Sequence, residues 1–143
     1  MHLDLRVPVR RIAAQLVLDG GSTREATLFL ADGESMGDLL GRAEAFLPVE
    51  EGGRMRFYAR RAVACITVPA SPASADDELG LARRAVIARL RGGGERAGQL
   101  RFAASPGGRT LEVLNQAAAS LVLHDGDRVH YVATAHVERV EEV

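Results

Sequence analysis

The sequence of 143 residues predicts an α+β protein, mainly β, made of two tandem ββαββ units. We expect each unit to be a small bent antiparallel sheet or barrel with one short helix. Two observations predict this fold. The chain aligns with itself without a gap at a shift of 74 residues, from residues 10–67 onto residues 84–141. Apolar residues also alternate in the same register in both copies, which favours an internal duplication.

The alternation places one apolar set of each matched strand on a single face. A slip of one residue would turn such a set outward, so we expect all of these sets to point into a core. The matched sets are Ile12, Ala14, Leu16 and Leu18 with Val86, Ala88 and Leu90; Ala26, Leu28 and Leu30 with Leu100, Phe102 and Ala104; and Met55, Phe57 and Ala59 with Val129, Tyr131 and Ala133.

Each copy has the same order of expected elements. The first has strands at 9–18 and 25–31, a helix at 35–44, a strand at 46–50 and a long β segment at 54–68 that bends or splits in two. The second has strands at 85–91 and 99–104, a helix near 110–117, a strand at 121–124 and a long segment at 128–141. Glycine-containing turns separate the strands.

Capping residues mark the start of each helix. Ser35 followed by Asp38, and Thr110 with Glu112, resemble arrangements that satisfy the free N–H groups of a first turn.

One stretch gives conflicting signals. Leu79, Ala82, Val86 and Leu90 recur at helical spacing, so residues 78–91 taken alone predict an amphipathic helix. The internal repeat predicts a strand from about Ala85, and we follow the repeat.

The repeat also sets the domain organisation. Residues 1–68 form the first unit, residues 69–79 a linker of Pro, Ala, Ser and Asp composition, and residues 80–143 the second unit. A unit of about 60 residues buries a small fraction of its surface, so the copies should pack together or the chain should oligomerise. The last strand of the first unit is the more apolar, and we expect it to be buried on both faces and its counterpart on one.

Composition excludes several classes of protein. Hydrophobic residues make up 47% of the chain and charged residues 26%, as in folded globular domains rather than disordered ones. The net charge of −1 gives no global attraction to nucleic acid or membrane. The sequence shows no apolar run long enough to span a bilayer and no signal-peptide pattern, so a cytoplasmic location is expected. The single cysteine, Cys65, excludes an internal disulfide and reads as a buried thiol.

Residues 54–69, which run Arg-Met-Arg-Phe-Tyr-Ala-Arg-Arg-Ala-Val-Ala-Cys-Ile-Thr-Val-Pro, resemble the closing strand pair of Sm-like barrels such as bacterial Hfq. The resemblance implies an SH3/Sm-like barrel that binds RNA, with Ala59-Arg60-Arg61 at the position of the RNA-contacting tip. The helix at 35–44 departs from the Sm pattern. The unit is also similar to an uncharacterised family of small bacterial domains with Gly-Asp-Leu-Leu followed by Phe-Leu-Pro-Val, here residues 37–40 and 46–49.

The densest basic patch supplies the candidate binding residues, which are Arg54, Arg56, Tyr58, Arg60 and Arg61. Alternation puts the first four on one side of a strand, an arrangement suited to guanidinium contacts with phosphates and to stacking of the aromatic ring on a base. The competing interpretation is a solvated strand face balanced by Glu44, Glu50 and Glu51.

No pattern in the sequence indicates catalysis, a metal site or a cofactor. His130 and His136 lie six residues apart, a spacing that matches no standard ligand motif, and are expected to face solvent. The sequence therefore predicts a non-catalytic interaction or regulatory module, not an enzyme. It is expected to bind a protein partner or to self-associate through exposed sheet edges or a cleft formed by the repeat. No small-molecule substrate is indicated. The alternative is an Sm-like RNA-binding protein.

Overall fold

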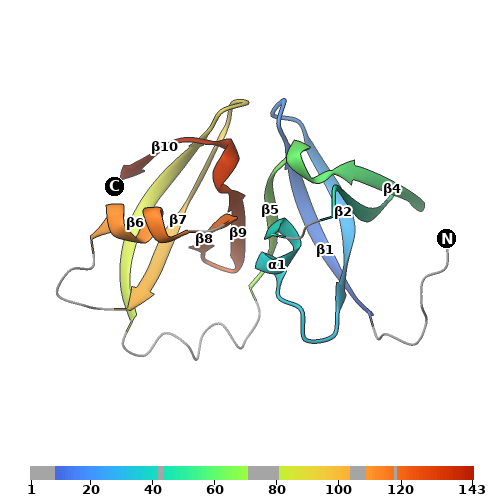
Figure 1. Ribbon diagram of the computed structural model, residues 1–143, viewed down its shortest axis with the longest axis horizontal. Helices are drawn as coiled ribbons and strands as arrows, with labels where there is room; N and C mark the ends of the chain where they lie inside the picture. Colours follow the sequence, from blue (N-terminus) through green and yellow to red (C-terminus); the bar gives the residue numbers. More distant parts are fainter. Residues whose placement is uncertain (1–8, 42–43, 71–80, 104–108, 118) are drawn as a thin grey trace.

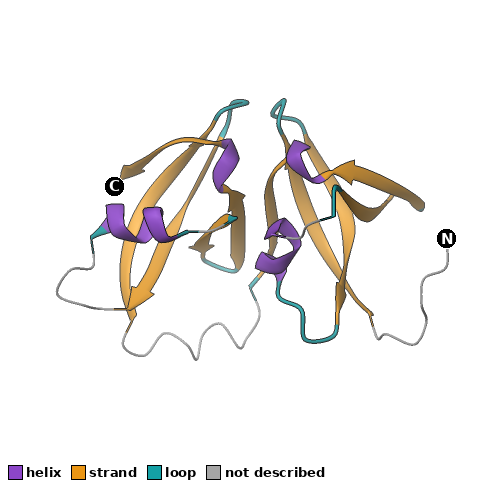
Figure 2. Cartoon of the chain, in the orientation of Figure 1, coloured by secondary structure: helices purple, strands orange, loops and turns teal. Residues whose placement is uncertain are grey.

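The computed structural model describes residues 9–41, 44–70, 81–103, 109–117 and 119–143 of the chain (Figures 1 and 2). In the first half the elements are β1 (Val9–Leu18), β2 (Thr23–Ala31), α1 (Met36–Gly41), β3 (Phe46–Glu51), β4 (Arg54–Ala59), the 3-10 turn η1 (Arg60–Ala62) and β5 (Val63–Pro69). In the second half they are β6 (Leu81–Leu90), β7 (Glu95–Ala103), α3 (Thr110–Gln116), β8 (Ser120–Asp125), β9 (Arg128–Ala133), the 3-10 turn η2 (Thr134–His136) and β10 (Val137–Glu142).

All the described strands belong to one antiparallel, open sheet in the order β10-β6-β7-β8-β9-β5-β1-β2-β3-β4. The predicted fold of two ββαββ units, each closing into its own sheet or barrel, is therefore wrong. The reason is the pairing of β5 with β9, which runs from Cys65 opposite Val132 to Pro69 opposite Arg128 and joins the two halves edge to edge. A pairing between halves uses backbone hydrogen bonds that closure of each half would otherwise need.

The long β segment of each half splits in two, one of the two outcomes that the sequence allowed. A 3-10 turn interrupts it at Arg60–Ala62 and again at Thr134–His136. The turn sends β4 and β5 to opposite ends of the first half, whose strand order is β5-β1-β2-β3-β4. Each half thus contributes five strands rather than four.

The second half repeats this order as β10-β6-β7-β8-β9. Leu18 of β1 pairs with Val63 of β5, and Leu90 of β6 pairs with Val137 of β10. Leu18 and Leu90 are therefore equivalent, and corresponding residues of the two first hairpins differ by 72 in number. After the hairpins the difference is 74, as between Val63 and Val137 themselves. The ungapped alignment is thus off by two residues in the hairpins, a slip that leaves each side chain on its expected face. The duplication itself stays a prediction.

Within the disputed stretch, residues 81–90 form a strand, which begins four residues before the predicted start at Ala85. β6 pairs with β7 along its length, from Leu81 opposite Ala103 to Arg89 opposite Glu95. Tertiary pairing therefore overrides the helical spacing of its apolar residues. The predicted linker at 69–79 lies outside the described residues except for Pro69, the last residue of β5, and Ala70.

The two predicted helix caps have different outcomes. Ser35 and Asp38 form the expected capping box, in which the Ser35 N–H donates to Asp38 Oδ2 at 2.9 Å and the Asp38 N–H donates to Ser35 Oγ at 3.3 Å. Thr110 is instead the first residue of α3, whose N-cap Arg109 makes no side-chain cap bond.

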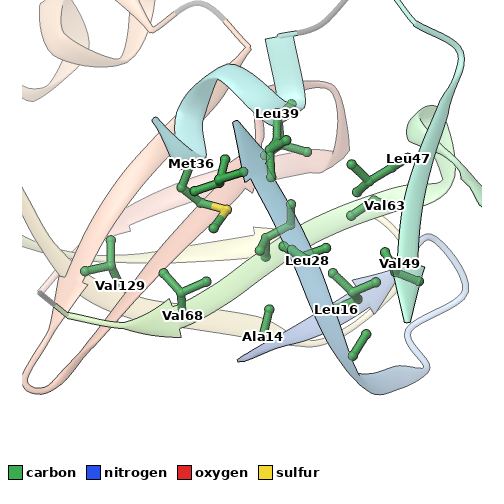
Figure 3. Packing of buried hydrophobic residues seen from close by; sticks show 14 residues of the cluster. Ala14, Leu16, Leu28, Met36, Leu39, Leu47, Val49, Val63, Val68 and Val129 are labelled. Atoms are coloured by element: carbon green, nitrogen blue, oxygen red, sulfur yellow. The ribbon is translucent and has the colours of Figure 1, made fainter. Parts of the chain in front are cut away.

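Two apolar clusters lie on the two sides of β5. The first contains Leu16, Leu28 and Ile66 with Met36 and Leu39 of α1, and Figure 3 shows the α1 side chains pointing into it. The second includes Val17, Ala64 and Cys65 together with side chains of the second half. Every residue from Val63 to Val68 is buried, whereas β10 has no fully buried residue. The expected asymmetry between the two last strands is confirmed.

The tips of the first hairpin of each half lie side by side (Figure 1). A Cβ atom added at Gly92 would stand 1.6 Å from the carbonyl oxygen of Asp19, so only glycine permits this approach. Among the described residues, no helix has both the length and the apolar character to cross a membrane.

Candidate interaction surface at the edge of the sheet

The β4 strand forms one end of the sheet, and β10 forms the other. In the part of the chain that the structure describes, β4 pairs only with β3. One row of β4 backbone N–H and C=O groups therefore faces away from the sheet with no strand beside it. Such an edge is a ready template for pairing with another strand.

The register of β3 and β4 sorts their side chains by face. Residues directly opposite each other share a face, so Arg56 lies with Val49, and Tyr58 with Leu47, on the side of the buried core. Phe57 lies opposite Pro48 on the outer face.

Three large apolar side chains stand on this outer face, and we call them the β4 outer patch. Phe46 is 60% exposed, Met55 38% and Phe57 53%. Met55 and Phe57 were predicted to point into a core, and for both the prediction is wrong. The physical reason is position in the sheet: their counterparts Val129 and Tyr131 on β9 are packed against the first core cluster, whereas no described element covers the outer face of β4.

The core side of β4 carries a cluster around Glu51. Arg24 Nη1 and Arg56 Nε lie 3.7 and 3.9 Å from Glu51 Oε2, and the Tyr58 hydroxyl donates to Glu51 Oε1. That hydrogen bond, with burial, raises the pKa of Tyr58. Glu51 thus partly offsets the positive charge of Arg56. This agrees with the competing interpretation, in which Glu51 is one of the residues that balance the basic strand face.

The predicted basic stripe is only partly assembled. Arg54, Arg56 and Tyr58 share the core side of β4, but Arg60 and Arg61 belong to the 3-10 turn and leave the alternation. Glu50 pairs with Arg11 at 3.2 Å rather than with this stripe. Glu44 is exposed, and no side chain among the described residues is recorded as its partner.

The two turn arginines line a surface hollow of about 420 Å³ together with Ala45, Phe46 and Ala59. Arg60 Nη1 is buried and has no hydrogen-bond acceptor among the described residues. The backbone carbonyl of Arg61 lies 2.6 Å from His136 Nε2, which brings the turns of the two halves together. An arginine pair beside an exposed aromatic ring can bind an anion and stack on a planar group.

A second polar cluster lies where the halves join. Thr67 Oγ1 is 2.7 Å from His130 Nδ1, and His130 Nε2 is 3.0 Å from Asp125 Oδ2. His130 is 3% exposed, so the prediction that it faces solvent is wrong, because β9 is an interior strand of the joined sheet. Burial lowers its pKa, which favours the neutral ring.

This hydroxyl–imidazole–carboxylate chain has the order of a nucleophile, a base and an orienting acid. Thr67 is only 3% exposed, however, so no substrate reaches its hydroxyl in this conformation. The chain of hydrogen bonds therefore stabilises the junction. Sequence reasoning missed it, because Thr67 and His130 are far apart in the chain and match no motif.

The remaining predicted residues are placed as follows. Cys65 is buried, as predicted, and burial raises its pKa. His136 belongs to the turn η2 and not to the strand of His130. His2 lies outside the described residues. In the described ranges, no group of three or more His, Cys, Asp or Glu side chains is arranged to hold a metal ion.

Comparison of the chain with protein-family models, with curated proteins and with solved structures gives no match in any of the three.

Proposed function

We propose that this chain is a non-catalytic interaction module that binds a protein partner along β4 by adding a strand to its sheet. The β4 outer patch, with Phe57 53% exposed on a strand whose outer edge has no described strand beside it, is the observation that carries the proposal. Strand addition obtains affinity from backbone hydrogen bonds and specificity from the side chains beside the edge. Here the outer patch contacts apolar side chains of the partner, and the Glu51 cluster contacts polar ones.

The experiment compares the immobilised wild-type chain with Phe57→Glu in an extract of the source cells, followed by repetition with each purified bound protein. The matched control is Val9→Glu, which alters an exposed valine on β1, away from the patch. A partner that binds the wild type and the control but not Phe57→Glu supports the proposal. Partners unaffected by Phe57→Glu contradict it, as does the absence of any partner, a second copy of this chain included.

A second candidate function is RNA binding at the hollow lined by Arg60, Arg61 and Phe46. The observation that favours it is the buried Arg60 Nη1, which lacks an acceptor among the described residues. Labelled single-stranded RNA is titrated at about 50 and about 200 mM salt, a range over which phosphate-dominated binding weakens strongly. Salt-sensitive binding lost in Arg60→Ala/Arg61→Ala but kept in Arg109→Ala supports this function. Absence of binding at the lower salt contradicts it.

A further inference from the structure

The junction between the two halves shows how two edge strands of this fold pair, with β5 of the first half beside β9 of the second. On the receiving side, β9 accepts β5, while α1 of the first half contacts β8 and β9 from one face (Figure 1). The joined side chains are buried, as Val129 and Val132 show with 4% and 0% exposure.

The two edge strands of the sheet, β4 and β10, are the counterparts of the two strands that pair at the internal junction. The first half ends in β4, which occupies the position that β9 occupies in the second half. The second half ends in β10, which occupies the position of β5. A surface that accepts and a surface that donates therefore remain free on every chain, among the residues described.

We infer that the partner of β4 is a second copy of this chain, whose β10 and α3 dock head to tail on β3 and β4 in the geometry of the internal β5–β9 junction. The inference rests on the proposed function and identifies its partner. A contact between unlike surfaces repeats from chain to chain, and so produces either a closed ring or a filament.

The internal register transfers directly, because both strands of the junction differ from their counterparts by the same 74 residues. On the outer face it sets Val140 opposite Phe57 and Glu142 opposite Met55. On the core side it sets Arg139 opposite Tyr58 and Glu141 opposite Arg56. In this register the apolar Val140 lies opposite the exposed ring of Phe57, and the negative charge of Glu141 lies opposite the positive charge of Arg56. These two cross-strand pairs are complementary in polarity and in charge.

Exposed apolar side chains occur on both surfaces. Leu111 on α3 is 66% exposed and occupies the position of Gly37 on α1. A Cβ atom at Gly37 would lie 4.0 Å from Cε1 of Tyr131, and Phe57 is the counterpart of Tyr131. The docked Leu111 therefore contacts Phe57 of the next copy, which removes both from water.

The internal junction and the proposed junction between copies differ in the charge of the side chains on their core side. The internal junction places Cys65 and Thr67 against Val132 and His130, all buried. The equivalent positions between copies hold Arg139 and Glu141 against Tyr58 and Arg56. A charged contact is compatible with surfaces that remain soluble when apart, and it makes assembly depend on salt.

The test uses the full chain and two single variants that disable different surfaces. Phe57→Glu disables the accepting surface and Leu111→Glu the donating surface, with Val9→Glu as the control. Both target residues are exposed in one chain, so folding is retained, which circular dichroism verifies. Light scattering and analytical ultracentrifugation measure the mass from about 1 µM to about 1 mM, a range that detects even weak association.

The expected result is a concentration-dependent multiple of 15.3 kDa for the wild type and the control, and a single chain for each variant alone. An equimolar mixture of Phe57→Glu and Leu111→Glu should form a complex of two chains, because each variant keeps the surface that the other lacks. Assembly by Leu111→Glu alone would overturn the inference, since it would mean that β4 pairs with itself.

A wild-type chain that stays monomeric over the whole range would also overturn the inference. If a different protein then binds the wild type and not Phe57→Glu, the proposed function stands, and only the inference that the partner is a second copy fails. If no protein binds, both are overturned.

Discussion

Thr67 and His130 face each other across the only strand pairing that joins the two halves in the described structure, with 2.7 Å between Oγ1 and Nδ1. His130 Nε2 lies 3.0 Å from Asp125 Oδ2. A carboxylate only accepts, so the neutral ring donates from Nε2 and receives the threonine hydroxyl at Nδ1. Both nitrogens of a buried imidazole are thereby satisfied.

Thr67→Val should destabilise the fold by about 1–3 kcal/mol, because it leaves His130 Nδ1 buried without a donor. The change keeps the shape of the side chain, so packing is little altered. Urea unfolding measures the effect. Thr67→Ser is the matched control, since it retains the hydroxyl, and equal losses in the two variants would argue against the hydrogen bond.

The folded chain should lose stability in mild acid through His130. Its pKa in the fold is lowered from 6.5, first by burial and also by Arg96 and Arg128, while Asp125 acts in the opposite direction. The unfolded chain therefore binds the proton more readily. The stabilisation is complete above pH 6.5 and declines as the pH falls from there toward the lower folded pKa. Urea unfolding from pH 7.5 to pH 5 measures it, and His130→Gln should flatten this dependence.

Gly92→Ala should destabilise the protein by about 1–3 kcal/mol, because its methyl group would collide with the Asp19 carbonyl of the neighbouring hairpin. Gly20→Ala is the control, since no atom lies within 4 Å of a Cβ atom there. Thermal unfolding compares the two variants. A Gly92→Ala protein as stable as Gly20→Ala would mean that the hairpin tips do not touch in solution.

Leu28→Ala should cost about 2–5 kcal/mol, because Leu28 is fully buried in the first core cluster. Leu111→Ala should change the stability of a single chain by less than about 0.5 kcal/mol, because Leu111 is exposed. Denaturant unfolding of dilute protein measures both. A large cost at Leu111 in dilute protein would place that side chain in the chain's own core rather than at a docking surface.

Assembly of the chain should respond to charge in a reciprocal way. Glu141→Arg and Arg56→Glu should each weaken self-association by about tenfold, through like charges that face each other. The double variant should recover most of the affinity, since it exchanges the two signs. Sedimentation at low and high salt measures this. No recovery in the double variant would contradict the register that sets Glu141 opposite Arg56.

The sequence predicted much of the local structure. The alternation of apolar residues placed β1, β2, β3 and β8 within a few residues, and the repeat correctly predicted a strand from about Ala85, although β6 already begins at Leu81. The capping box at Ser35 was also read correctly. These features depend on neighbours in the chain, on backbone geometry and on side-chain period, and all of that information is local.

Tertiary structure alone decided how the strands combine. Alternation shows which side chains share a face, and it does not show whether another element covers that face. Met55 and Val129 have the same pattern, yet Met55 is exposed at the edge β4 and Val129 is buried at the interior strand β9. Which edge pairs with which is decided by contacts between residues far apart in the sequence, such as Thr67 and His130, and these contacts also determine which edges remain free to bind.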